Sequence, residues 1–297
     1  MSGKKLWMGI PTSRMQWVPA PLSDAEMTRD RFTETIKYEN GGGDARKSSA
    51  FQKQYTFNYN RPLKGSEELG VFNKFASGFY GNGLLCFADP YIFDINMFNE
   101  VWSTPGLSEY GWPNIYEGDP TFEDLPDPLY EQPRRKAVYT ITADANTPPA
   151  RASKIFTIPI PPTHTLWIGA SGEATGTAVV QVRPIDANGA YTTASNLTLL
   201  DPNGATRMNA SFAGSSYSAV EVYLARTSSA ASTITLASMM AQLHPTGTTP
   251  TLTGDHQQGL GHTGLMFLDD AQTESYVYID PPRKALTTTL FEVGAWR

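Results

Sequence analysis

Alternating apolar and polar positions predict a chain built mainly from β-strands. The clearest example is residues 51–59, where Phe, Lys, Tyr, Phe and Tyr occupy the odd positions and Gln, Gln, Thr and Asn the even ones. A period of two is typical of a strand with one packed face and one face in water. Shorter apolar runs predict further strands at residues 6–10, 84–88, 136–143, 156–160, 165–169, 177–185, 196–200, 219–226, 233–243, 264–268, 275–279 and 286–293. The expected fold class is therefore mainly β.

The middle of the chain differs in composition from its flanks. Residues 155–250 contain four acidic residues and three arginines, and they contain no lysine. Asn188-Gly189 and Asn203-Gly204 are hairpin signals within this part, because Asn-Gly accepts the positive φ angles that such turns need. Short strands with turns at this spacing predict an antiparallel jelly-roll β-sandwich. In architecture, such a sandwich resembles carbohydrate-binding modules and galectin-like domains.

Two short helical segments are expected in the first half of the chain. Residues 67–75 predict one short helix. Asp94 is placed to cap one or two helical turns on which Phe93, Met97 and Val101 share a face.

Two other segments of the first half have partial signals. Residues 23–26 have the spacing of a capping box, yet residues 27–32 lack apolar periodicity, so a helical turn and a loop both remain open. Residues 41–47 predict a polar loop, because a phosphate-binding loop would need an amphipathic helix after its glycines.

Residues 78–112 carry Phe, Tyr, Trp and Pro at high density, interrupted by Gly. Aromatic clusters usually pack into a core. Here the rings follow one another too closely for all of them to point inward. The stretch therefore predicts a partner interface that includes Tyr80, Tyr91, Trp102 and Trp112.

The same stretch resembles a known family. The run YGNGLLCFADPYIFDINMFNEVWSTPGL is similar to a stretch in minor tail proteins of long-tailed phages (siphoviruses), especially those of actinobacteria, and LTTTLFEVGAW is similar to their usual ending. The resemblance implies an N-terminal, β-barrel-like domain of residues 1–154 that is completed by C-terminal strands in residues 251–297. The sandwich of residues 155–250 is then an insertion.

The resemblance also implies a function. A distal tail protein of this kind is a structural virion protein that forms a homo-oligomeric ring, usually a hexamer, between the tail tube and the tail tip or baseplate. Its partners would be the tail tube protein, the tape measure protein and the tail hub proteins. The chain would be assembled in the host cytoplasm, would use no cofactor and would not be an enzyme.

Composition limits the other functions open to the chain. A net charge of −6 argues against broad binding to nucleic acid. The only cysteine, Cys86, cannot form an internal disulfide, and it is expected to be a small core residue of a protein that folds in a reducing compartment. No apolar run approaches the length of a membrane span or of a signal-peptide core.

Catalytic and metal-binding patterns are weak. The sequence contains no G-x-S-x-G, H-E-x-x-H or P-loop motif. Glu123 and Asp124 suggest a glycosidase pair, but they lie in an acidic, proline-rich segment (residues 112–133) that is expected to be irregular and exposed. Asp255, His256 and His262 are too few for a zinc site, so a turn is expected there and no metal.

Trp167 and Tyr223 are candidate glycan contacts, because aromatic rings stack on sugars. The alternative for Trp167 is a place in the sandwich core. Two hypotheses for the sandwich therefore remain, contact with host cell-wall glycan and a spacer. The alternative function for the whole chain is that of a carbohydrate-binding protein or glycan-active enzyme.

Overall fold

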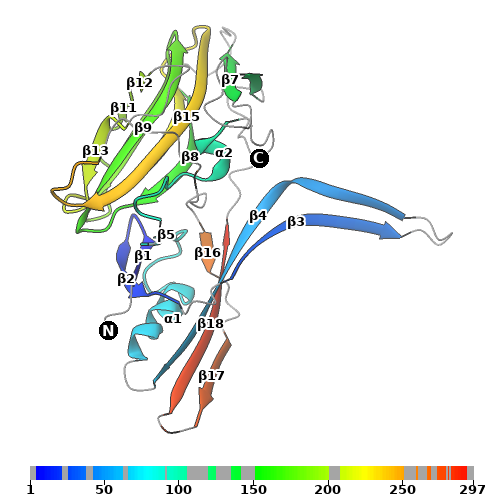
Figure 1. Ribbon diagram of the computed structural model, residues 1–297, viewed down its shortest axis with the longest axis vertical. Coiled ribbons are helices and arrows are strands. Elements are labelled where there is room, and N and C mark those ends of the chain that lie inside the picture. Colours follow the sequence, from blue (N-terminus) through cyan, green and yellow to red (C-terminus); the bar gives the residue numbers. More distant parts are fainter. Residues whose placement is uncertain are drawn as a thin grey trace.

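The computed structural model describes residues 5–21, 26–37, 43–62, 66–90, 92–105, 120–124, 135–141, 151–200, 208–250, 259, 266–268, 273–278, 280 and 282–292. The described chain consists of strands joined by turns, with one 3-10 helix and two short α-helices (Figure 1). The predicted mainly-β class is confirmed.

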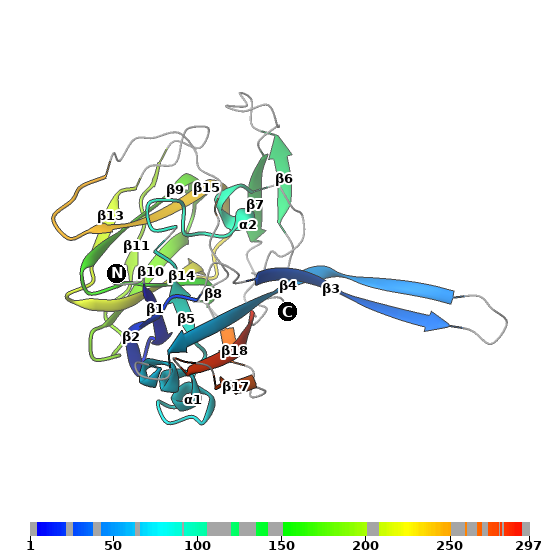
Figure 2. The same cartoon turned by 60° about the horizontal axis from the view of Figure 1, so that its bottom comes forward.

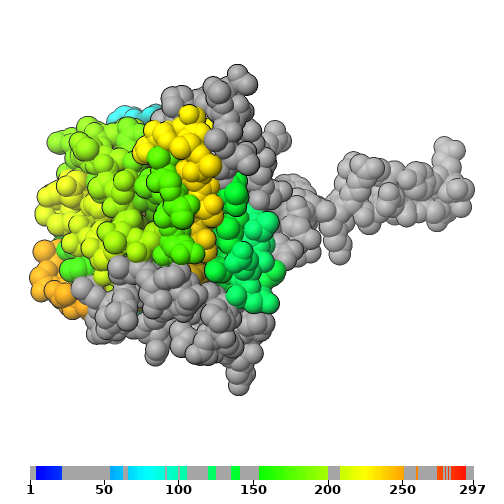
Figure 3. Space-filling view, turned by 90° about the horizontal axis from the view of Figure 1, so that it is seen from above, coloured from blue at the N-terminus to red at the C-terminus, as the bar shows by residue number. Residues whose placement is uncertain are grey.

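Two mainly antiparallel sheets pack face to face and form a sandwich, in the upper part of Figure 1. The four-stranded sheet has the order β11-β10-β14-β8, with β8 Arg151–Pro159, β10 Ala178–Asp186, β11 Ser195–Asn196 and β14 Tyr217–Arg226. The facing sheet has the order β12-β9-β15-β7-β6, with β6 Thr121–Asp124, β7 Arg135–Ile141, β9 His164–Thr175, β12 Leu199–Leu200 and β15 Ser232–Pro245. A further strand, β13 Ala210–Ala213, pairs with β9. Seen from above, β9 and β15 lie side by side (Figure 3).

Alternate residues of the facing strands meet in one apolar core. Val222 and Leu224 of β14 are fully buried and belong to the same cluster as Leu166 and Ile168 of β9. Burying a side chain of this kind contributes about 1.5–3 kcal/mol. The sandwich is therefore held mainly by the inward positions of its strands, and the intervening residues face outward.

β6 and β7 extend the sandwich to residues before 155. The acidic segment was expected to be irregular, but Thr121–Asp124 forms an edge strand that pairs with β7. Lys136 Nζ lies 3.3 Å from Glu123 Oε2, and Arg135 Nε lies 3.4 Å from Asp124 Oδ1. Cross-strand ion pairs of this kind support an edge strand. Both carboxylates are exposed, which removes the physical basis for a glycosidase pair.

A small sheet of order β2-β1-β5 lies directly below the sandwich in Figure 2, and its residues belong to two apolar cores. Its strands are β1 Lys5–Ile10, β2 Arg14–Pro19 and β5 Cys86–Ala88. Trp7 and Ala88 belong to the sandwich core, whereas Leu6, Met8 and Phe87 belong to the second core. β1 and β5 are thus almost entirely buried between the two cores, whereas part of β2 is exposed, and the small sheet connects the sandwich to the rest of the chain.

The second core lies under a sheet of order β16-β18-β4-β3, with β17 also paired to β18. Its strands are β3 Glu26–Lys37, β4 Gly43–Pro62, β16 Met266–Leu268, β17 Thr273–Val277 and β18 Arg283–Glu292. The 3-10 helix η1 (Glu67–Leu69) leads into α1 (Gly70–Ala76), where a short helix was predicted, and Phe72 packs on Tyr59 of β4. β18 pairs antiparallel with β4, so the C-terminal strand lies beside the first part of the chain. This sheet and the small sheet β2-β1-β5 both have open edges, and the described strands do not form the predicted barrel.

Three local expectations were wrong. Residues 27–32, for which a helical turn or a loop was open, belong to strand β3. Residues 43–47, expected to be a loop, begin strand β4. The short helix α2 (Glu100–Ser103) begins after Asn99, whose Oδ1 accepts a hydrogen bond from the Trp102 backbone N at 3.0 Å. Asn99 rather than Asp94 therefore caps this helix.

The predicted turn at Asn188-Gly189 is present. Asp186 Oδ1 accepts hydrogen bonds from the backbone N atoms of Asn188 and Ala190, both at 2.8 Å. Gly189 has a φ of 86°, and a Cβ at this position would lie 2.5 Å from the carbonyl oxygen of Thr12. Glycine is thus required both for the turn and for its contact with the small sheet. The second predicted turn, at Asn203-Gly204, lies outside the described residues.

Candidate functional site

The long hairpin formed by β3 and β4 projects from the body as an arm (Figures 1 and 2). Near the body, β4 is flanked by β18 on one side and β3 on the other. The pairing of β18 with β4 ends at Gln54, which faces Phe291. Beyond that point, Arg29–Lys37 pairs only with Gly43–Lys53 among the described strands, over a length of about 35 Å at 3.4 Å per residue. The register shifts between Arg31 and Thr33.

A free two-stranded ribbon is physically unusual. An isolated hairpin is at best marginally stable in water, because it has no third strand and no packed face. Each edge of the ribbon also presents backbone N–H and C=O groups that can pair with another chain. The arm is therefore the part of the described molecule that is best suited to contact a partner.

The predicted interface residues that the structure describes, Tyr80 and Trp102, differ in burial. Tyr80 is half-buried, and its ring packs at 5.0 Å from Phe75 and 5.2 Å from Phe79. Phe79 is 73% exposed and stands beside Tyr80 on the outside of the second core. The sequence interpretation missed Phe79, although it lies within the same aromatic stretch.

The prediction that Trp102 belongs to a partner interface is wrong. Its side chain is fully buried in the sandwich core together with Phe98 and Met97. Residues 93–97 follow the edge of β15, where Met97 N donates to Ala241 O at 2.7 Å, and this places α2 against the sandwich. Trp102 is therefore a packing residue rather than an interface residue. Tyr91 and Trp112 lie outside the described residues.

The two candidate glycan contacts lie on opposite outer faces of the sandwich. Trp167 is flanked on β9 by the core residues Leu166 and Ile168, so its half-buried side chain points away from the core. Tyr223 is flanked on β14 by Val222 and Leu224 and points outward from the other sheet. The two rings therefore cannot stack on one sugar. Trp167 belongs neither to the core that was its alternative nor to a site shared with Tyr223.

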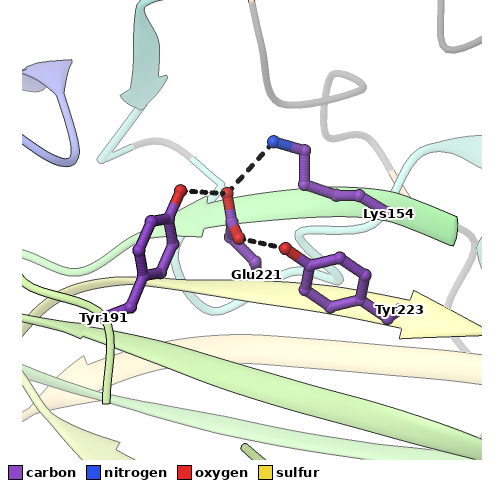
Figure 4. Close-up of polar contacts among 4 residues, drawn as sticks. All are labelled: Lys154, Tyr191, Glu221 and Tyr223. Atoms are coloured by element: carbon purple, nitrogen blue, oxygen red, sulfur yellow. Dashed lines mark hydrogen bonds and ion pairs between the residues drawn. The ribbon is translucent and has the colours of Figure 1, made fainter. Parts of the chain in front are cut away.

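Tyr223 is part of a polar cluster on the outer face of the four-stranded sheet (Figure 4). The Glu221 carboxylate, 3% exposed, accepts a hydrogen bond from Lys154 Nζ at 3.0 Å and one from Tyr191 Oη at 3.5 Å, while Tyr223 Oη donates to its other oxygen. The Arg183 guanidinium lies 4.0 Å from the centre of the Tyr191 ring. We call these residues the Glu221 cluster.

The electrostatics of the cluster suit a structural role. Burial, followed by the hydrogen bond to the Glu221 carboxylate, raises the pKa of the Tyr223 hydroxyl, so the tyrosine stays neutral. Cys86 lies near this cluster and is fully buried, as predicted. Burial raises the pKa of its thiol, while the charge of Lys154 lowers this pKa and that of Glu221 raises it. Both oxygens of the carboxylate are engaged and the thiol is protonated. Neither group is poised for nucleophilic or acid–base chemistry.

Other kinds of site are not found in the described part of the chain. It contains no group of three or more His, Cys, Asp or Glu side chains that could hold a metal ion. Asp255, His256 and His262 lie outside it. None of the described helices is long and apolar enough to cross a membrane.

Comparison with known proteins identifies no family. No family model matches the chain, and no curated protein matches its sequence. Among solved structures, the infectious bursal disease virus VP2 subviral particle is similar over 93% of this chain and 83% of that chain, with 12% identity and a TM-score of 0.23. The structure of the infectious bursal disease virus Gt strain is similar over 97% of this chain and 78% of that chain, with 11% identity and a TM-score of 0.23. A likeness this weak supports no inference about fold or function.

Proposed function

We propose that the chain is a structural virion protein at the distal end of a long-tailed phage tail, where copies close into a ring through the arm. The observation that carries the proposal is the free ribbon Arg29–Lys37 with Gly43–Lys53, which extends beyond the body with both edges unpaired among the described strands. Such a ribbon is stabilised when it packs or pairs on a neighbour. The proposed function is therefore assembly through contact surfaces and not catalysis.

A ring is built from head-to-tail contacts, in which one surface of each copy binds a different surface of the next copy. Each copy therefore needs two such surfaces. The arm is the first surface. The second is the edge strand β17, which pairs only with β18 among the described strands and lies at the opposite side of the sheet from β3. Tyr276 is 50% exposed on β17, and Tyr278 just after it is 87% exposed.

Charge supports this pairing. Residues 29–53 contain six Lys and Arg and four Asp and Glu, a net charge of +2 on a chain whose total is −6. Residues 269–280 contain four Asp and Glu and no Lys or Arg, although one of the four, Glu274, is already paired with Lys284 of β18 at 2.9 Å. Opposite charges steer association and disfavour arm-to-arm contacts. The arm of one copy thus lies against the β17 edge of the next.

The place in the virion rests on the resemblance of residues 80–107 and 286–296 to distal tail proteins. That resemblance makes six copies the expected number. It makes the tail tube, tape measure and tail hub proteins the expected partners, and assembly takes place in the host cytoplasm. Phe79 and Tyr80, on the outside of the second core, lie on a further surface for these contacts.

The proposal is tested with an arm-deleted variant. Asp30 faces Gln52 in the register, so residues 31–51 can be replaced by Asn-Gly, which closes a two-residue hairpin turn. Electron microscopy of the purified full chain is expected to show rings, and the variant is expected to be monomeric and to keep a cooperative thermal unfolding transition. A Tyr276→Ser/Tyr278→Ser variant with the arm intact should also fail to form rings. Rings formed by the arm-deleted variant would overturn the proposal.

A further inference from the structure

A pocket of about 550 Å³ opens where the sandwich meets the small sheet. Three distant parts of the chain line it. Lys5 and Trp17 come from β1 and β2, Phe93 and Asp94 from the segment after β5, and His164 and His244 from the adjoining ends of β9 and β15. Its volume falls within the range of small-molecule sites, about 300–1,000 Å³.

Trp17 provides the pocket with an aromatic surface. Its side chain is 37% exposed. Its ring centre lies 5.2 Å from that of Trp7, in an edge-to-face arrangement with an angle of 62°. Trp7 is buried in the sandwich core, so Trp17 is held in place while part of its ring faces solvent. An aromatic ring fixed in this way is suited to contact an apolar ligand face.

The hydrogen bonds around His244 fix its protonation pattern. Gln242 Nε2 donates to the Asp94 carbonyl oxygen at 2.8 Å, which leaves Gln242 Oε1 as an acceptor. That oxygen lies 2.9 Å from His244 Nε2, so Nε2 carries the proton. In the neutral imidazole, Nδ1 is then the acceptor.

His164 lies beside His244 at the ends of the paired strands, with Pro245 opposite it in the register. Its ring packs edge-to-face on Phe93 at 4.8 Å, and its Nδ1 lies 3.0 Å from Thr163 Oγ1. This contact occupies Nδ1 and leaves Nε2 as the second ring nitrogen for a ligand. Burial lowers the pKa of both imidazoles, and His244 lowers that of His164 further. Two neutral imidazoles at neutral pH offer both donors and acceptors.

The charges around the pocket disfavour an anionic ligand. Lys5 Nζ lies 3.6 Å from Glu68 Oε1, so its charge is already partly compensated. Asp94 is exposed and adds a carboxylate to the rim. Phosphate and sulfate are normally held by uncompensated cations, which the described lining residues do not supply. Hydroxyl groups, by contrast, can donate to a carboxylate and exchange hydrogen bonds with neutral imidazoles.

We propose that this pocket binds one sugar residue of an uncharged glycan. The apolar face of the sugar lies on Trp17, and its hydroxyl groups bond His244 Nδ1, His164 and the Asp94 carboxylate. The site is separate from both Trp167 and Tyr223, and it does not depend on ring formation. It is a different place for the glycan contact that the sandwich architecture suggests.

The test uses the full chain and defined probes, the methyl glycosides of glucose, galactose, rhamnose and N-acetylglucosamine. Saturation-transfer NMR detects binding, and titration gives Kd for each variant. We expect at least one probe to bind at millimolar concentration, and Trp17→Ala and Asp94→Asn each to weaken it about tenfold or more. Asp94 is exposed, so Asp94→Asn leaves the fold intact and the result interpretable. Tyr223→Phe and Trp167→Phe are matched controls that should bind unchanged.

Three results would overturn the inference. The first is that none of the four probes binds. The second is that binding survives both pocket variants or is lost in a control variant. The third is that inorganic phosphate displaces the bound glycoside, which would identify an anion site instead.

Discussion

Lys154 Nζ lies 3.0 Å from Glu221 Oε1, and this ion pair joins the edge strand β8 to its neighbour β14. The two partners are unequally buried, since the side chain of Glu221 is 4% exposed and that of Lys154 is 35% exposed. Water can solvate the ammonium group if the carboxylate is removed. It cannot solvate the carboxylate to the same degree if the ammonium group is removed.

Removing Lys154 is therefore expected to cost more stability than neutralising Glu221. Lys154→Met leaves a buried carboxylate without its cation and should lower the free energy of unfolding by about 3–5 kcal/mol. Glu221→Gln keeps a hydrogen-bonding group beside Tyr223 and should cost about 1–2 kcal/mol. Urea unfolding of the two variants measures the difference.

The double variant Lys154→Met/Glu221→Gln provides the control. Because it removes both charges together, it should be more stable than Lys154→Met alone. A larger loss in Glu221→Gln than in Lys154→Met would contradict the assignment of the carboxylate as the buried partner.

Alanine variants of Trp102 and Phe79 compare a buried packing residue with an exposed residue of the predicted interface stretch. Trp102 is fully buried, so Trp102→Ala should lower the free energy of unfolding by about 3–5 kcal/mol. Phe79 is 73% exposed, so Phe79→Ala should cost less than about 1 kcal/mol. Thermal or urea unfolding measures both. Near-native stability of Trp102→Ala would restore Trp102 as a surface residue.

The two pocket histidines predict a dependence of stability on pH. Burial lowers the pKa of His164 and His244 in the folded chain below the ordinary value of 6.5. As the pH falls through about 6.5, the unfolded chain takes up these protons first. Above that pH, proton uptake by the two histidines does not change the free energy of unfolding. Below it, the free energy of unfolding falls as the pH drops towards the folded-state pKa values.

Urea midpoints between pH 7.5 and 5 test this prediction in the chain and in a His164→Gln/His244→Gln variant. Other titrating groups are common to both chains, so the variant should lose less stability over this range. An equal or steeper loss in the variant would show that the two imidazoles are not held neutral by the fold.

Local patterns predicted the parts of the fold that depend on neighbouring residues. The turn after Asp186 and the helix around Phe72 follow from side chains within a few positions of each other, and both are present. Residues 51–59 lie within strand β4, as their period of two predicts.

The remaining features depend on contacts between distant parts of the chain. Residues 26–37 lack a period of two, and they form β3 because they pair with β4. Trp167 and Tyr223 each occupy an outward position of a strand, but only the packing of the two sheets shows that they face opposite ways. The pocket brings Trp17 to His164 and His244, which no spacing in the sequence indicates.

Ring assembly through the arm, as proposed here, determines the mass of the purified protein in solution. One chain has a mass of 32.5 kDa. Native mass spectrometry of the full chain over a range of concentrations is predicted to show one discrete closed oligomer, with six copies expected. The variant in which Asn-Gly replaces residues 31–51 is predicted to show the monomer. A full chain that stays monomeric at every concentration, or an arm-deleted variant that forms an oligomer with the same number of copies, would contradict ring formation through the arm.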